Sequence, residues 1–130
     1  MRLWTSLLVA LLLCSCTSHR AGQGYRIVSR TVDMRGVPGA FEGVAHYSDL
    51  YYASRRLGTV GQWSISPSGR FALFEDTGKL LLFDRDLGQT REVTDGGFAI
   101  PKTFDWNEGA GTVEVAYFAG HSPSRIELRK

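Results

Sequence analysis

Two short apolar runs constrain this chain more than any other feature of its sequence. Phe71-Ala72-Leu73-Phe74 and Leu80-Leu81-Leu82-Phe83 are continuous rather than alternating. Such runs between glycine-containing turns are too short for helices, because a helix of a globular domain needs about ten residues or more. A continuous apolar strand is one that is covered on both of its faces. The two runs therefore predict strands buried on both sides.

Three turn signals divide the stretch from Gln62 to Thr94 into four segments. Ser66-Pro67-Ser68-Gly69 places Pro at the first central position of a type I turn and Gly where φ is positive. Asp76-Thr77-Gly78 and Asp86-Leu87-Gly88 offer the same glycine position twice more. The last segment, Thr90 to Thr94, carries charged residues, as an exposed edge strand should. We therefore predict a four-stranded antiparallel meander here.

This meander resembles the TolB-type, WD-repeat-like β-propeller repeat. The resemblance rests on the Trp-Ser-Ile-Ser-Pro-Ser-Gly sequence that begins at Trp63, on the strand that ends at Asp84, and on the Val-Thr exit at Val93. That repeat has Ser-Pro-Asp-Gly where this chain has Ser68, and Leu-Thr where it has Val93. The resemblance implies a propeller blade, and a generic antiparallel meander is the alternative.

A second unit of the same kind follows between residues 99 and 130. Short strands are predicted over 103–106, 112–118 and 125–128, with turns between them. Trp106 lies 43 positions after Trp63, each in an entry strand. A spacing of about 40–45 residues is the period of propeller repeats. We therefore expect a second, three-stranded blade-like sheet.

The region before the first blade carries the candidate contact surface. Residues 25–32 are rich in β-branched side chains and predict a strand, residues 41–45 suggest another, and residues 49–56 fit either a short helix or a strand. Tyrosines beside arginines have the composition of binding hot spots. We predict a contact surface made of Tyr51, Tyr52, Arg55 and Arg56. The alternative is that the tyrosine rings are buried against the first sheet.

The N-terminus has the pattern of a bacterial lipoprotein signal. Residues 1–15 contain one early Arg and an apolar core too short to span a bilayer, which predicts a signal-peptide helix. Leu13-Cys14-Ser15-Cys16 resembles the lipobox, and two cysteines so close cannot form an unstrained disulfide. The resemblance implies diacylglyceryl transfer to Cys16, cleavage before it, and acylation of its amine. An ordinary secretory signal with Cys16 unmodified is the alternative.

The lipobox resemblance also carries the predicted location and domain layout. We expect residues 16–24 to be the lipidated Cys and a polar tether, of which Thr17 to Gly24 would reach at most about 27 Å at about 3.3–3.6 Å per residue. Residues 25–130 would be a single all-β domain. Thr17 stands where the family's inner-membrane retention signal has Asp. That favours an outer-membrane anchor, facing the periplasm or the cell surface, if the host is Gram-negative.

Motifs for catalysis, cofactors or metals do not emerge from the sequence. The formal net charge of +2 gives no electrostatic case for nucleic acid. The Asp-x-Asn-x-Gly pattern at 105–109 lacks the distal ligands of a calcium loop and is better interpreted as a hairpin turn. The histidines at 19, 46 and 121 lack metal-site spacing. We therefore predict no cofactor, no metal and no enzymatic activity.

Together these patterns predict an all-β antiparallel meander of about eight or nine short strands. They would form two propeller-blade-like sheets or a small β-sandwich, because two blades cannot close a ring that takes about four to eight. We predict the first of three functions, and the other two are its alternatives. The first is a membrane-anchored, non-catalytic envelope module that binds another envelope protein or a cell-wall component. The second is a structural subunit that oligomerises through its sheets, and the third is an envelope hydrolase.

Overall fold

The computed structural model describes residues 16–35, 38, 43–93 and 100–129. The predicted signal-peptide helix, residues 1–15, lies outside these described residues. The described chain is all-β, as the sequence predicts, and its regular structure consists of strands alone. They are β1 (Cys16–Gly22), β2 (Tyr25–Asp33), β3 (Val44–Tyr52), β4 (Arg55–Thr59), β5 (Trp63–Ile65), β6 (Phe71–Asp76), β7 (Lys79–Asp84), β8 (Gln89–Glu92), β9 (Pro101–Asn107), β10 (Thr112–Tyr117) and β11 (Ser124–Glu127).

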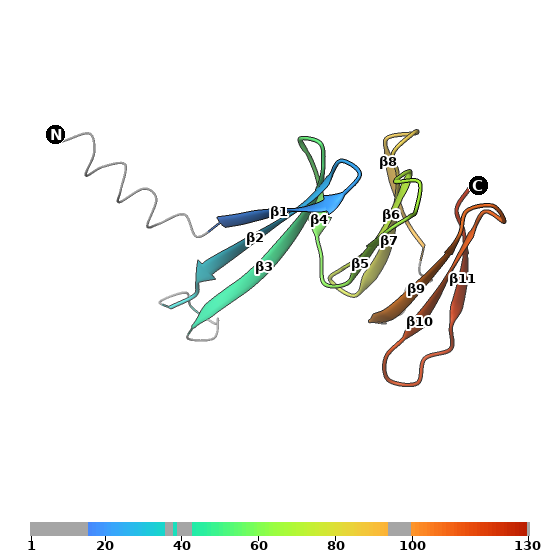
Figure 1. Ribbon diagram of the computed structural model, residues 1–130. Helices are drawn as coiled ribbons and strands as arrows, with labels where there is room; N and C mark the ends of the chain where they lie inside the picture. The colour runs from blue at the N-terminus through green and yellow to red at the C-terminus, as the bar shows by residue number, and fades with distance from the viewer. Residues whose placement is uncertain (1–15, 36–37, 39–42, 94–99, 130) are drawn as a thin grey trace.

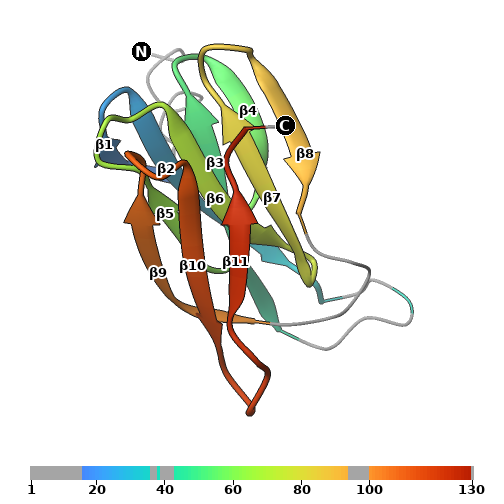
Figure 2. The same cartoon turned by 90° about the vertical axis from the view of Figure 1, so that its right-hand side faces the viewer.

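The strands form three antiparallel sheets that follow one another along the chain (Figure 1). The first sheet has the order β1-β2-β3-β4, the central sheet β5-β6-β7-β8, and the third sheet β9-β10-β11. Every sheet is a simple meander in chain order. In Figure 2 the first strands of the three sheets, β1, β5 and β9, lie on one side of the molecule, and β4 and β8 lie on the other.

The predicted central meander and the three-stranded unit after it are both confirmed. The described part of the chain nevertheless holds eleven strands in three sheets, where about eight or nine strands in two sheets were expected. The additional sheet arises before residue 60, because the ambiguous segment 49–56 is the β3–β4 hairpin. Residues predicted to be a tether form β1, whose pairing with β2 runs from Cys16–Arg30 to Gly22–Tyr25. That correction has a simple cause: the open edge of β2 offers backbone partners to a polar segment.

The apolar runs of β6 and β7 are buried on both faces, as predicted. Phe71, Leu73, Leu80 and Leu82 pack against the third sheet in one core. The alternating residues point the other way because side chains alternate across a strand. They pack against the first sheet in a second core, which contains Ala72, Phe74, Leu81 and Phe83. The central sheet is therefore a shared layer between two hydrophobic cores.

The Ser66–Gly69 turn joins the central sheet to the first sheet. Gly69 has φ of +79°, a conformation that L side chains rarely adopt, and a Cβ atom there would also crowd the Gln23 side chain, so glycine is required. The buried Tyr25 hydroxyl donates to the Gly69 carbonyl at 3.0 Å, and Gln23 Nε2 donates to the Pro67 carbonyl at 2.6 Å. Burial of Tyr25 raises the pKa of its hydroxyl, which therefore stays protonated as a donor.

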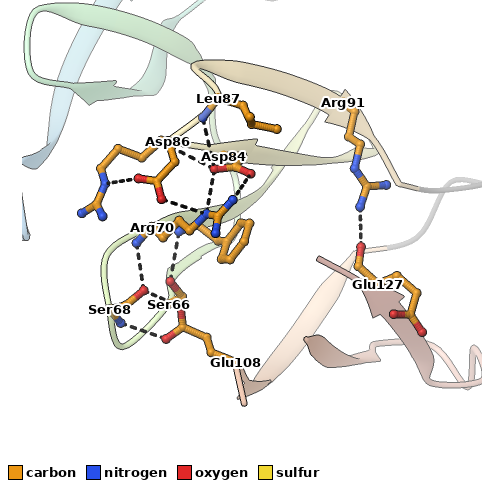
Figure 3. Close-up of polar contacts among 11 residues, drawn as sticks. Ser66, Ser68, Arg70, Asp84, Asp86, Leu87, Arg91, Glu108 and Glu127 are labelled. Carbon is orange, nitrogen blue, oxygen red and sulfur yellow. Dashed lines mark hydrogen bonds and ion pairs between the residues drawn. The ribbon is translucent and has the colours of Figure 1, made fainter. Parts of the chain in front are cut away.

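The same turn also joins the central sheet to the third sheet, as Figure 3 shows. Glu108 accepts hydrogen bonds from the backbone N–H of Ser68 at 2.9 Å and from its hydroxyl. Further along, Arg91 on β8 donates to the Glu127 carbonyl on β11. The indole N–H of Trp106 on β9 donates to the Ser64 hydroxyl on β5 at 2.8 Å. The first strands of the central and third sheets, β5 and β9, are therefore in contact, and so are their last strands, β8 and β11.

Candidate binding face

One face of the first sheet carries the residues from which we build a candidate site. Ile27 and Leu50 point into the core shared with the central sheet. Their neighbours on β2 and β3 consequently point away from it. Cross-strand pairing aligns Arg26 with Tyr51, and Arg30 with Tyr47. We call this surface the tyrosine–arginine face, and it comprises Arg20, Arg26, Val28, Arg30, Tyr47, Asp49, Tyr51 and Arg56.

Arginine side chains stack on tyrosine rings across this face. The guanidinium carbon of Arg26 lies 5.1 Å from the centroid of the Tyr51 ring. That of Arg30 lies 4.7 Å from the Tyr47 ring. At exposed positions such contacts contribute about 0.5–1 kcal/mol each. Arg20 pairs with Arg26 on the neighbouring strand and adds a further exposed cation. The stacking orders large rings and cations before any partner arrives.

Asp49 lies at the centre of the face and organises its cations. Its carboxylate is 4% exposed and accepts hydrogen bonds from Arg30 Nε at 2.9 Å, Arg56 Nη2 at 3.2 Å and Thr59 Oγ1 at 2.8 Å. Burial alone would raise the pKa of this carboxyl, but the hydrogen bonds from Thr59, Arg30 and Arg56 outweigh it and lower the pKa. Asp49 is therefore ionised, and it holds two arginines that remain partly exposed.

The predicted contact residues divide between two surfaces. Tyr51 and Arg56 pair with each other and belong to the tyrosine–arginine face. Tyr52 instead points toward the central sheet, where its ring centroid lies 5.7 Å from that of Phe83. It also lies 4.9 Å from the ring centroid of Tyr25 on the neighbouring strand β2. Arg55 pairs with Tyr52 across the β3–β4 hairpin and donates to the Gly88 carbonyl at 2.6 Å. The structure thus brings only half of the predicted set together, and Tyr52 and Arg55 join the first sheet to the central one.

Sequence reasoning missed most of this face. Arg20, Arg26, Arg30 and Asp49 were not among the predicted contact residues. The signal was nevertheless present, because Arg26, Val28 and Arg30 recur with the period of two that places residues on one face of a strand. The positions opposite them on β3 follow only from the strand register, which the sequence does not provide.

A pocket of about 300 Å³ lies beside β8 and is lined by Arg70, Arg91 and Arg129. This volume is at the lower end for a small-molecule site. Its arginines are largely engaged, because Arg70 makes two 3.1 Å contacts with Asp84 and Arg91 donates to a carbonyl of β11 (Figure 3). These contacts brace neighbouring strands, so we do not take this pocket as the candidate site.

We expect Tyr51 and Tyr52 to respond differently to substitution. Tyr52→Ala should lower the free energy of unfolding by about 2–4 kcal/mol, because it removes an aromatic ring from the core. Tyr51→Ala should cost about 1 kcal/mol or less, since it removes one stacking contact from an open face. Urea denaturation of both variants measures the difference. Equal losses would contradict the assignment of the two rings to different faces.

Asp49 should contribute stability that depends on pH. Its pKa is lower in the folded chain than the ordinary value of 3.8, so its contribution is complete above that value and is lost as pH falls through the folded pKa. Asp49→Asn should therefore be much less stable than the wild type at neutral pH, and the gap should narrow in acid. Chemical denaturation from neutral pH to well below the ordinary value of 3.8 tests this window. Asp105→Asn, at an exposed position, serves as the control, and a gap independent of pH would refute the prediction.

Neither the remaining local geometry nor comparison with known proteins assigns a function to this face. Within the described residues, no group of three or more His, Cys, Asp or Glu side chains is placed to hold a metal ion. The Asp-x-Asn-x-Gly pattern at 105–109 leads into a hairpin turn, in which Asn107 Oδ1 accepts a hydrogen bond from the Ala110 N–H at 3.1 Å. The described part of the chain also contains no helix long and apolar enough to cross a membrane. No protein-family model, curated protein or solved structure matches this chain.

Proposed function

We propose that this chain is a membrane-anchored lipoprotein of the cell envelope and acts as a non-catalytic binding module. The membrane anchor is inferred from the lipobox-like residues Leu13-Cys14-Ser15-Cys16. The observation that carries the binding role is the tyrosine–arginine face, where ordered cations and rings lie on a sheet surface that no other described strand covers. Tyrosine and arginine are enriched in binding hot spots. Tyrosine offers a large contact area with few rotatable bonds to restrict. Arg26 and Arg30 are already ordered by stacking on tyrosine rings. Nucleophilic catalysis would need a nucleophile and a general base within hydrogen-bond distance of each other, and the residues of this face do not provide such a pair.

The partner's chemistry follows from the charges on the face. Arg20, Arg26, Arg30 and Arg56 are balanced by Asp49 alone among the residues of the face. The best complement is therefore an acidic protein surface, approached by electrostatic steering. Two of the arginines are already held by Asp49, so they lose less freedom on binding than free side chains would.

The anchor would sit directly on the domain. Cys16 is the first residue of β1 and pairs with Arg30 of β2. If Cys16 carries lipid, no flexible spacer separates the acyl chains from the first sheet. Two or more acyl chains hold a protein stably at a membrane, at about 0.8 kcal/mol for each buried CH₂. The binding face would then be presented close to the membrane surface, in a restricted orientation.

Cys16→Ala should abolish lipid attachment, because alanine has no thiol to receive the diacylglyceryl group. We expect the variant to lose the mass of the lipid and to leave the membrane fraction or remain unprocessed. Cys14→Ala is the matched control, since it removes the neighbouring thiol and keeps a small residue in the lipobox-like pattern. Membrane fractionation with intact-mass measurement gives the result. Unchanged mass and fractionation of Cys16→Ala would overturn the anchoring proposal.

A photo-reactive amino acid at position 51 tests the binding face directly. Placed at Tyr51 in the full chain in cells, it should form a covalent adduct with whatever lies on the face. The same probe at the exposed residue Thr77 should form none, because that position lies in the turn between β6 and β7 and is not part of the tyrosine–arginine face. Mass spectrometry of the adduct identifies the partner. Absence of any adduct from position 51 would overturn the proposed function.

A further inference from the structure

The outward face of the third sheet carries charge of the opposite sign. Val113, Val115 and Ile126 point into the core, so their neighbours on the same strands point outward. Cross-strand pairing aligns Glu114 with Asp105 on one side and with Arg125 on the other. We call this surface the acidic face, and it comprises Asp105, Asn107, Thr112, Glu114, Arg125 and Glu127. Three carboxylates thus face one arginine, which Glu114 binds at 2.7 Å.

These two faces are the ends of one layered stack. The central sheet is covered on both sides, whereas the tyrosine–arginine face and the acidic face are each uncovered by the described strands. The three meanders run in the same order, with first strands β5 and β9 in contact and last strands β8 and β11 in contact. Sheets that repeat radially in this way close into a ring when about four to eight are present. Three described sheets leave such an arc open at both ends.

We propose that a second copy of this chain fills the gap. Its acidic face would lie on the tyrosine–arginine face of the first copy, and the reverse contact would form at the other end. The result is a two-fold symmetric ring of six sheets, within the range of closed propellers. The inference rests on the proposed function, because it identifies the occupant of the same binding face.

Charge favours this pairing over the other two ways in which copies could meet. Two tyrosine–arginine faces would bring arginines together, and two acidic faces would bring carboxylates together, so both like pairs repel. Only the mixed pair is complementary. A closed dimer makes that contact twice, and the second contact forms within the complex rather than between free molecules. Copies anchored in one membrane would also meet at a raised local concentration.

The polar character of both faces sets the expected strength of the dimer. The acidic face has no large apolar side chain among its defined residues. The apolar surface of the tyrosine–arginine face comes mainly from the tyrosine rings and Val28. Association should therefore be dominated by charge, reversible, and weakened by salt. This distinguishes it from the contacts between sheets within one chain, which are built from buried aliphatic and aromatic residues.

The first experiment measures the mass of the full chain, purified in detergent, by sedimentation equilibrium and native mass spectrometry. We expect a dimer whose dissociation constant rises about tenfold or more between about 0.05 M and about 0.5 M salt, because screening weakens contacts between exposed charges. A monomer at all concentrations in low salt would overturn the proposal. Polymers that lengthen with concentration would also overturn it, since they indicate a contact that does not close.

A charge exchange then tests the faces themselves. Arg26→Glu and Asp105→Arg alter exposed positions, one on each face, and each alone should raise the dissociation constant about tenfold or more. Combining both substitutions in one chain should restore much of the dimer, because the opposite charges again face each other. Lys79→Glu, at an exposed position on β7, is the control and should change nothing. Circular dichroism and thermal melting verify that every variant is folded. Dimers that survive both single substitutions would overturn the assignment.

The adduct from position 51 separates this inference from the proposed function. An adduct of twice the chain mass, carrying a peptide of β9, β10 or β11, supports the second copy. An adduct with a different protein keeps the binding module and overturns the second copy as its occupant. No adduct overturns both.

Discussion

The burial of both faces of β6 and β7 is the constraint on which the rest of the structure depends. A sheet with one apolar face needs one covering layer, but a sheet whose strands are apolar on both sides needs two. Each large apolar side chain that is fully buried contributes about 1.5–3 kcal/mol, so exposing either face of the central sheet would remove several such contributions. The first and third sheets are these covering layers, and each brings its own buried residues to one of the two cores.

Polar contacts give this layered stack its alignment. The Ser66–Gly69 turn receives Tyr25 and Gln23 from the first sheet and bonds to Glu108 of the third. Hydrophobic contacts are not directional, whereas hydrogen bonds of defined geometry specify one arrangement of the layers. A single turn can serve both neighbours because the central sheet is only one layer thick. The turn that the sequence marks most clearly is therefore also the point where all three sheets are joined.

The outward faces of the stack differ from its interior because no described layer covers them. Because they are not packed against another layer, they carry charged residues. The outward face of the first sheet is mainly basic, and that of the third sheet is mainly acidic. On the first sheet, a buried carboxylate holds arginines against tyrosine rings, which is an ordered surface rather than a scatter of mobile side chains. On the third sheet, carboxylates predominate. A stack with unlike ends is suited to recognition by charge at either end, and the anchor that we propose at Cys16 would orient the basic end relative to a membrane.

The sequence by itself determined the all-β class, the doubly buried strands at 71–74 and 80–83, their glycine turns, and the three-stranded unit that follows. These features are local, because an apolar run requires burial and a turn glycine supplies positive φ whatever the rest of the chain does. The sequence did not reveal that residues 16–22 form a strand, since a polar segment becomes one only when an open edge accepts it. Nor did it separate Tyr51 from Tyr52. Alternation shows which residues share a face, but only the neighbouring sheet decides which face is covered, and here it covers Tyr52.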